Sequence, residues 1–437
     1  MMKELIQRAW IVKTGNVNKD LPFKGYLVID HGKIVEIDKG DPPQKLISEV
    51  DHITDAKGKW LMPGLVNTHG HLGSSLLRGH GDDLKLDTWL KNVMWPNEQK
   101  FNRELVQTAT ELAISEMIRT GTTTYLDMYH LSMPEHAEMA LEKGFRAVLC
   151  RGMIAFGSKE EQEAKLQESI ELAKEYHNQG EGRLRIMLSP HAPYTCPPSF
   201  FERTAELASE HSLMIHTHAS ETAQETVRHF EEYGMRPVEH LYDLGILNQD
   251  VLLAHAVHLN AKELEMLKET DTAVSHNPMS NLKLGSGIAD IPAMLQKGIR
   301  VAIGTDSTAS NNSLDLFEEM RFAAMIQKGI YQDPTVTKAE EILRMGTREG
   351  ANILGYQEAG DICEGLDADL ILIDPDQPHL TPWTPERIHS HLIYAVKGSD
   401  VTDVWIRGKR QMKQKNLLMI DEEKIFYESN ELVKYFE

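Results

Sequence analysis

Short runs of apolar residues recur through the middle of the chain, and stretches with helical spacing separate them. Such runs are too short for most helices and are typical of buried strands. Helical spacing is clear at Leu105, Ala109, Leu112 and Ile118, where the predicted helix ends before Gly121. The eight predicted strands are Gly64–Val66, Thr122–Leu126, Arg146–Cys150, Leu184–Leu188, Leu213–Ile215, Val251–Ala254, Thr272–Val274 and Val301–Ile303.

Eight strands that alternate with helices favour a (β/α)8 TIM barrel, an α/β fold, over an open sheet. We predict this barrel over residues 63–363. Capping boxes open two of the expected helices, one at Ser132–Glu135 that closes at Gly144, and one at Thr337–Glu340 that runs to about Ile353. Further helices are expected at Ser199–Ala208, Ala261–Leu267, Ile291–Gln296 and Leu314–Lys328.

Both ends of the chain have a different pattern, because alternating or clustered apolar residues stand between turn signals such as His31–Gly32. This pattern is typical of strands. The expected strands are Trp10–Val12, Tyr26–Ile29, Ile34–Ile37, Asp369–Ile373 and Val404–Ile406. We therefore predict a small β-sandwich domain that both termini form, over residues 1–62 and 364–437.

Polar residues stand at the carboxyl ends of all eight predicted barrel strands. In this fold those ends meet on one face, which carries the chemistry. Polar loops alone would explain one or two such positions, but not a set with so many histidines. The residues are His69 and His71, Asp127, Arg151, His191, His218, His255, His276 and Asp306.

The histidines and Asp306 together predict a metal site. In an extended strand, His69 and His71 would point to the same side and could bind one ion together. Neutral imidazoles with one carboxylate suit Zn²⁺ or Fe²⁺ better than Mg²⁺ or Ca²⁺. Three histidines and one aspartate leave a position open for water, which is typical of a catalytic site.

The residues alone leave two ligand positions open. His216 and His218 lie on the same side of their strand, so either could bind the metal. His255 could be a further ligand or a hydrogen-bond partner of the water. Glu221, three residues after His218, suits a proton carrier, although it could also be a surface glutamate at the start of a helix.

Composition narrows the class of protein. The 437 residues include 46 Lys and Arg against 66 Asp and Glu, a formal charge of −20, which disfavours nucleic acid and membrane surfaces as partners. Three scattered cysteines, Cys150, Cys196 and Cys363, fit a reducing compartment and exclude thiolate zinc sites. We see no signal peptide and no apolar stretch of about 18 residues, so we expect a cytoplasmic protein.

The motifs resemble those of the amidohydrolase superfamily, in particular its deaminase branch, over essentially the whole chain. The segments that carry the resemblance are Met62–His71, His218 with Glu221, His255, and Gly304–Ser307. Gly365–Leu370 resembles the tail by which that family re-enters its composite sheet domain.

Narrower features resemble the 5′-methylthioadenosine/S-adenosylhomocysteine deaminases. Met94–Glu98 is similar to the segment whose glutamate, here Glu98, binds the ribose hydroxyls. Arg151 and His191 are similar to the other substrate-contact positions of that family. Since Glu98 and Arg151 could equally be surface charges, the assignment to this subgroup depends on the resemblance.

The resemblance implies metal ligands His69, His71, His218 and Asp306, with His255 beside the water. The end of the fourth strand offers His191 and no lysine, which implies one divalent metal, Zn²⁺ or else Fe²⁺. The implied enzyme is an adenosine-type deaminase in which a metal-bound hydroxide attacks the amino-bearing carbon of adenine. Glu221, His255 and Asp306 would be catalytic, and Glu98, Arg151, His191, Glu221 and Asp306 would contact the substrate.

The expected partner is a small adenine nucleoside, which is 5′-methylthioadenosine, S-adenosylhomocysteine or adenosine, and the expected assembly is a homo-oligomer. One alternative is a guanine, cytosine or triazine-type aminohydrolase of the same superfamily, against which Glu98 argues. Another is a barrel that stores metal or binds a partner without catalysis, against which the full set of ligands with Glu221 argues.

Overall fold

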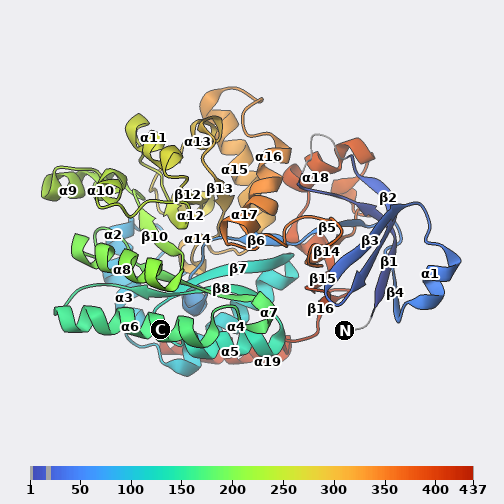
Figure 1. Ribbon diagram of the computed structural model, residues 1–437, viewed down its shortest axis with the longest axis horizontal. Coiled ribbons are helices and arrows are strands. Elements are labelled where there is room, and N and C mark those ends of the chain that lie inside the picture. Colours follow the sequence, from blue (N-terminus) through green and yellow to red (C-terminus); the bar gives the residue numbers. More distant parts are fainter. Residues whose placement is uncertain (1–2, 16–20, 437) are drawn as a thin grey trace. The chain divides into compact units, whose positions relative to one another are not determined.

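The computed structural model describes residues 3–15 and 21–436, and the chain divides into two compact units. One unit comprises Met1–Asn67, Ile114–Thr124 and Asp315–Glu422. The other comprises Thr68–Ala113, Tyr125–Leu314 and Glu423–Glu437. The strands form two sheets, which Figure 1 shows with their helices.

The first sheet is the predicted barrel. Its eight strands follow one another in chain order, from β6 to β13, and the recorded pairs from β8 to β13 are parallel. A bridge between Gly70 and Asp306 joins the first and last strand ends, and Thr68 N donates to Ile303 O over 3.0 Å. The (β/α)8 barrel is therefore confirmed. Its strands are β6 (Leu65–Asn67), β7 (Thr122–Tyr129), β8 (Arg146–Met153), β9 (Leu184–Pro190), β10 (Ile215–Ala219), β11 (Val251–His255), β12 (Ala273–His276) and β13 (Val301–Ile303).

Helices follow the barrel strands, and for example α6 and α8 pack on β9 (Figure 1). The α-helices are α1 (Gln44–Glu49), α2 (Leu86–Trp89), α3 (Trp95–Glu98), α4 (Arg103–Arg119), α5 (Met133–Lys143), α6 (Lys159–Tyr176), α7 (Gln179–Gly182), α8 (Pro198–His211), α9 (Ala223–Tyr233), α10 (Pro237–Asp243), α11 (Ala261–Glu269), α12 (Pro278–Lys283), α13 (Ile291–Lys297), α14 (Thr308–Asn311), α15 (Leu316–Tyr331), α16 (Ala339–Met345), α17 (Arg348–Ile353), α18 (Ile388–Tyr394) and α19 (Glu422–Leu432). Short 3₁₀ turns lie at Leu72–Leu77, Pro378–Leu380, Pro385–Arg387, Gly398–Asp400 and Val433–Tyr435, and a π-helical turn lies at Leu90–Met94.

Two predicted helix starts are wrong in detail. Ser132 precedes α5 but has a left-handed backbone with φ of 57°, and its side chain makes no cap hydrogen bond, so Ser132–Glu135 is not a capping box. Before α16, the backbone N–H of Lys338 donates to Glu341, so the expected box lies one residue later than Thr337–Glu340. The helix expected to reach Ile353 is also divided, into α16 and α17.

The second sheet contains strands from both ends of the chain, as predicted. Its nine strands are linked by hydrogen bonds into one sheet, in the order β17-β16-β15-β14-β5-β1-β2-β3, with β4 paired to β1. β14 pairs antiparallel with β5, which joins the C-terminal strands to the N-terminal ones. The strands are β1 (Glu4–Ile11), β2 (Phe23–Asp30), β3 (Lys33–Lys39), β4 (His52–Asp55), β5 (Trp60–Pro63), β14 (Leu370–Ile373), β15 (Val401–Ile406), β16 (Lys409–Lys413) and β17 (Asn416–Leu417).

Apolar residues lie on both faces of this sheet. Successive side chains on a strand point in opposite directions, and neighbouring positions such as Leu5 and Ile6 are both apolar. Leu5 packs in a cluster with Leu46 of α1, whereas its neighbour Ile6 packs in the larger cluster around Trp405. The core of this small domain, which both termini form as predicted, is supplied by one linked sheet with α1 against part of one face.

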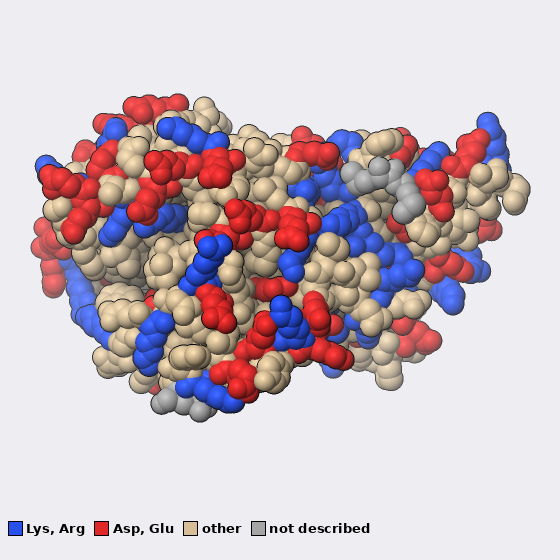
Figure 2. Space-filling view, turned by 90° about the horizontal axis from the view of Figure 1, so that it is seen from below, with Lys and Arg blue, Asp and Glu red and all other residues tan. Residues whose placement is uncertain are grey.

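On the face seen in Figure 2, acidic and basic side chains are mixed. Within the described residues, none of the helices is both long and apolar enough to span a bilayer. Among the described residues no disulfide joins any of the three cysteines, and Cys150 and Cys196 are buried.

Candidate active site

Side chains from the ends of the barrel strands line one cavity of about 440 Å³. Eight of the predicted site residues line it, namely His71, Glu98, Arg151, His191, His218, Glu221, His255 and Asp306. His69 is fully buried and belongs to the same group of metal-binding side chains. Two of the polar strand ends do not line the cavity, Asp127 and His276.

Strand geometry explains why His276 is excluded. Ser275 Oγ lies 2.7 Å from Thr68 Oγ1 and 3.2 Å from Asn277 Oδ1, so both neighbours of His276 point toward the barrel interior. Successive side chains alternate along a strand, and His276 therefore points outward. Asp127 instead accepts hydrogen bonds from Leu72 N at 2.7 Å and from His136 Nδ1 at 3.0 Å.

His69 and His71 converge, although neither lies in a strand, since β6 ends at Asn67. Hydrogen bonds to backbone carbonyl groups orient the rings of His71 and His218. His71 Nδ1 donates to Met128 O over 2.6 Å, and His218 Nδ1 donates to His191 O over 2.7 Å. A carbonyl oxygen can only accept, so both Nδ1 atoms carry a proton, and each Nε2 is left to bind either a second proton or a metal ion.

His216 orients His69 in the same way. Its Nδ1 donates to Leu252 O over 3.0 Å, which leaves its Nε2 as an acceptor. His69 Nδ1 lies 2.8 Å from that Nε2 and must therefore be the donor. Burial lowers the pKa of His69 to about 4, which keeps the ring neutral with a lone pair on Nε2. Of the two histidines left open in β10, His216 supports His69, while His218 faces the cavity.

The lone pairs of these rings point at a common space. His218 Nε2 lies 3.4 Å from His71 Nε2, and Asp306 Oδ1 lies 3.4 Å from His69 Nε2 and 3.3 Å from His71 Nε2. Ligand atoms around a tetrahedral zinc ion with bonds of about 2.0–2.2 Å lie about 3.3–3.6 Å apart. Lone pairs at such distances repel one another unless a cation lies between them, so the donor set fits a divalent metal ion.

Charge at the site supports the same interpretation. Burial lowers the pKa of His71, but the hydrogen bond and negative charge of Asp306 outweigh it and raise the pKa to about 9. Asp306 Oδ2 accepts hydrogen bonds from Ser280 Oγ at 2.5 Å and Ser310 Oγ at 2.9 Å. The carboxylate is thus held with Oδ1 toward the imidazoles, where a positive charge stabilises it.

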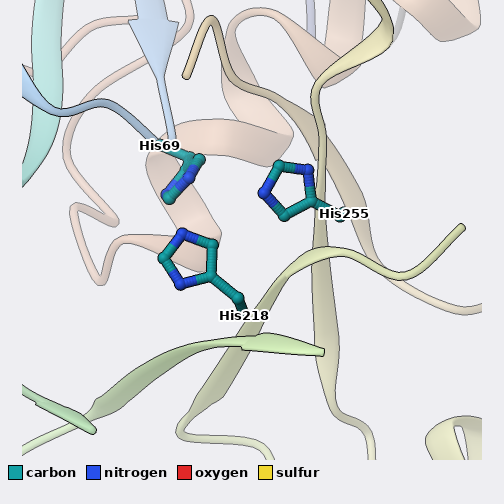
Figure 3. A group of neighbouring side chains, drawn as sticks. All are labelled: His69, His218 and His255. Carbon is teal, nitrogen blue, oxygen red and sulfur yellow. The ribbon is translucent and has the colours of Figure 1, made fainter. Parts of the chain in front are cut away.

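His255 lies next to this group. Figure 3 shows the rings of His69, His218 and His255 pointing toward one another from different segments, and their ligand atoms lie within 4.8 Å of one another. His255 Nδ1 donates to Asn281 Oδ1 over 2.8 Å, and His255 Nε2 lies 3.9 Å from Glu221 Oε2. By position, His255 could bind either a metal ion or a water beside it.

Glu221 is buried rather than on the surface. Only 4 % of the residue is exposed, and it lines the cavity within reach of His255. Burial raises its pKa, so the carboxyl holds a proton more tightly than an exposed glutamate does. A carboxyl group whose pKa is raised in this way can accept a proton and return it.

The remaining predicted residues line the same cavity. Burial raises the pKa of Glu98 to about 7. Arg151 Nη2 forms an ion pair with Glu168 Oε2 at 2.5 Å. His191 Nδ1 lies 2.9 Å from Thr195 Oγ1, and burial lowers its pKa to about 3. The cavity therefore combines carboxyl, guanidinium and neutral imidazole groups.

Comparison with known proteins agrees with this site. Residues 60–410 match the Amidohydrolase family. The chain belongs to that family.

Relatives of this amidohydrolase match over its full length. A protein of Halalkalibacterium halodurans named 5-methylthioadenosine/S-adenosylhomocysteine deaminase is 48% identical over 431 residues, which is 98% of each chain. An adenosine deaminase of Xanthomonas campestris with bound zinc has a TM-score of 0.92 at 33% identity, covering 99% of this chain and 98% of its own. An atrazine chlorohydrolase of Arthrobacter aurescens complexed with zinc has a TM-score of 0.89 at 25% identity, covering 98% of this chain and 100% of its own. The predicted superfamily is confirmed.

Sequence reasoning missed several contributors to this amidohydrolase site. Apolar side chains of one segment before α4 line the cavity, namely Leu86, Trp89, Leu90, Met94 and Trp95. This segment has no regular helical spacing of apolar residues, because α2, a π-helical turn and α3 follow one another there. The sequence pattern therefore did not indicate these side chains. Glu225 was also missed, and its hydrogen bonds are described below.

Proposed function

We propose that this amidohydrolase is a hydrolytic deaminase of adenine nucleosides. It converts the 6-amino group of 5′-methylthioadenosine, S-adenosylhomocysteine or adenosine to the inosine-type product and releases ammonia. The observation that carries this proposal is that Glu98 and Glu221 line the same cavity as the histidines and Asp306. The name of the full-length relative supports it.

We propose a single divalent metal, Zn²⁺ or else Fe²⁺, held by His69, His71, His218 and Asp306. The spacing of their donor atoms and the lowered pKa values of His69 and His218, which keep those two rings neutral, support this set. The zinc in two structural neighbours supports the choice of metal. When bound, such an ion lowers the pKa of a coordinated water and so makes it a nucleophile at neutral pH.

The carboxyl groups then move the protons. Glu221 accepts a proton from the attacking water and delivers it to the ring nitrogen beside the amino-bearing carbon, which removes the negative charge that develops there. Asp306 assists proton delivery to the departing ammonia. His255 orients the attacking oxygen through Nε2, because Asn281 holds its Nδ1.

The nucleoside is held by three further residues. Glu98 accepts hydrogen bonds from two ribose hydroxyls, as a carboxylate can through its two oxygens. His191 is neutral and contacts the purine, and Arg151 contacts the substrate farther along the cavity. The apolar side chains of Trp89 and Met94 give the cavity a wall that suits a thioether.

Four further predictions remain part of the proposal. The domain boundaries are residues 63–363 for the barrel and 1–62 with 364–437 for the sheet domain. The enzyme works as a homo-oligomer in the cytoplasm, and the lack of any disulfide among the described residues supports the reducing compartment. Neither nucleic acid nor a membrane is a partner, as the net charge of −20 suggests.

An ammonia-release screen tests the function. The zinc-loaded enzyme is incubated with adenosine, 5′-methylthioadenosine, S-adenosylhomocysteine, guanine and triazines, and ammonia is measured for each. We expect ammonia from the adenine nucleosides. Release from guanine or a triazine alone would instead favour the alternative aminohydrolase, and metal without ammonia from any of them would favour a barrel without catalysis.

Glu98→Ala tests the ribose contact. It should raise KM for nucleosides by about a hundredfold or more, because the two hydrogen bonds to this charged group contribute about 1.5–3 kcal/mol each. Any reaction on free adenine should stay nearly unchanged. If adenosine and adenine responded equally, Glu98 would not bind the ribose.

A further inference from the structure

Glu225 lies in the first turn of α9, behind the proposed proton carrier. Its carboxylate accepts two backbone hydrogen bonds from the loop that follows β10. Ser220 N donates to Oε1 over 3.0 Å, and Glu221 N donates to Oε2 over 2.7 Å. Both carboxylate oxygens therefore hold the peptide that carries the Glu221 side chain.

This arrangement goes beyond ordinary helix capping. A glutamate at this position usually reaches back to the backbone N–H of the capping residue, which here is Thr222, and the Thr222 backbone also acts on the Glu225 carboxyl. Thr222 Oγ1 already accepts a hydrogen bond from Glu225 N at 3.1 Å and caps α9. The two hydrogen bonds of the carboxylate extend past the cap to Ser220 and Glu221, so they stabilise the loop more than the helix.

The loop needs such support because its backbone is strained. Ser220 has φ of 52°, in the left-handed region, which costs a residue with a side chain about 1–2 kcal/mol. On the opposite side of the loop, His258 N donates to Ser220 O over 2.9 Å. Hydrogen bonds on both sides thus fix the peptide from which Glu221 reaches the cavity.

Glu225 is itself buried, with 8 % of the residue exposed. Burial and the nearby charge of Glu221 raise its pKa to about 7, whereas the backbone N–H groups act in the opposite direction. A buried carboxylate beside another one is costly for the fold. This cost indicates that its position serves more than the capping of a helix that already has a cap.

We propose that Glu225 is a positioning residue of the reaction, which fixes the Ser220–Glu221 peptide and thereby aims the Glu221 carboxyl at the substrate. This inference rests on the proposed function, in which Glu221 carries the proton. Glu225 acts through Glu221 and touches no reacting atom. Its loss should therefore slow the chemical step more than it weakens substrate binding.

The test uses the zinc-loaded full-length enzyme and the variants Glu225→Gln, Glu221→Gln and the double variant. Glutamine keeps the shape but turns an amide NH₂ toward one backbone N–H, which breaks that hydrogen bond. We expect kcat of Glu225→Gln to fall about 10- to 100-fold, as for other residues that orient catalytic groups, with KM within about threefold. The double variant should be within about threefold of Glu221→Gln, because the two residues act as a unit.

Asp315→Asn is the matched control. Asp315 also holds two backbone N–H groups with its carboxylate, those of Phe317 at 2.9 Å and Gly398 at 2.8 Å, and burial raises its pKa to about 6. It lies outside the residues that line the cavity. Asp315→Asn should lower Tm as Glu225→Gln does, while kcat stays within about twofold of the wild-type value.

Two results would overturn the positioning role. One is a Glu225→Gln variant with wild-type kcat and a lowered Tm, as in the control. The other is a double variant much slower than Glu221→Gln, because independent losses multiply. If Glu225→Gln does not fold, Glu225→Asp is the variant to measure, because the shorter aspartate side chain cannot reach both N–H groups. Wild-type turnover by Glu225→Asp would equally exclude the positioning role.

Different results would contradict the proposed function itself. A wild-type enzyme that releases no ammonia, or a fully active Glu221→Gln, would remove the deamination or the role of Glu221. An inactive Glu221→Gln beside a fully active Glu225→Gln would exclude only the positioning role. Zinc content and Tm of every variant, measured in parallel, exclude loss of metal or of the fold as the cause.

Discussion

Left-handed backbone residues occur, among other places, at hairpin turns of the sheet domain and at the ends of barrel strands. In the sheet domain they form the two-residue turns of three hairpins, His31–Gly32, Arg407–Gly408 and Gln414–Lys415. At the ends of the parallel barrel strands they include Ser220, His255 and Asp306, with φ of 52°, 73° and 62°, and all three are buried.

The two sets have different causes. A two-residue hairpin requires positive φ at both positions, because only that turn matches the twist of the paired strands. Parallel strands impose no such turn. Around Ser220, His255 and Asp306 the strained segments are held by hydrogen bonds that Glu225 and Asn281 accept and that Ser280 and Ser310 donate. Strain that the surroundings maintain in this way marks functional positions. Substitutions in the two regions should therefore separate activity from stability.

The largest expected effect is at the barrel ends. His69→Ala removes a proposed ligand, so we expect loss of bound zinc and a fall in kcat/KM of more than about ten-thousandfold. Zinc analysis of the purified variant and ammonia release measure the two effects. His31→Ala, in the exposed hairpin turn, is the control and should keep both metal and activity. Zinc-loaded His69→Ala with normal turnover would contradict the ligand set.

Glu221→Gln should have the next largest effect. The amide cannot carry the proton, so kcat should fall by about a hundred- to a thousandfold while zinc stays bound. Glu36→Gln in the sheet domain is the matched change, because Glu36 accepts a hydrogen bond from Tyr26 at 2.7 Å but lies outside the cavity residues. It should leave kcat unchanged. Normal turnover by Glu221→Gln would exclude it from the reaction.

The barrel and the face that carries most of the site residues could be predicted from the sequence. The periodicity indicated the barrel, and the polar residue after each apolar run indicated the face with the chemistry. The resemblance implied His218 as the ligand, but the residues alone left His216 and His218 open, because residues two apart share a face and only the contact of His216 with His69 separates them. The contacts of Glu225 with the loop could not be predicted for a related reason. Its spacing after Thr222 suits an ordinary cap, and only the path of the strained loop brings Ser220 N and Glu221 N to its oxygens.

A smaller effect concerns the pH dependence of nucleoside binding. Burial raises the pKa of Glu98 to about 7, so the group is neutral below that pH and charged above it. Because two ribose hydroxyls need the carboxylate as acceptor, KM for 5′-methylthioadenosine should fall as the pH rises from about 6 to 8, by up to about tenfold.

Glu98→Gln is the control for this titration. It should raise KM and flatten its pH profile. The folded protein favours the neutral carboxyl, so the contribution of Glu98 to stability is full below its unfolded pKa and is lost as the pH rises through about 7. Glu98→Gln should therefore unfold at a higher temperature than the wild-type protein at pH about 8. An unchanged pH profile of KM in Glu98→Gln would assign the titration to another group.

The smallest effect is expected in the sheet domain, where the left-handed backbone has no role in the reaction. Gly40 has φ of 82°, and a Cβ added there would meet no described heavy atom within 4 Å. Gly40→Ala therefore isolates the backbone strain from any clash. We expect the free energy of unfolding to fall by about 1–2 kcal/mol, with kcat and KM unchanged. Chemical denaturation and the ammonia assay measure the two quantities. A change in kcat would show that strain in the sheet domain reaches the active site, and the contrast between the two regions would then be wrong.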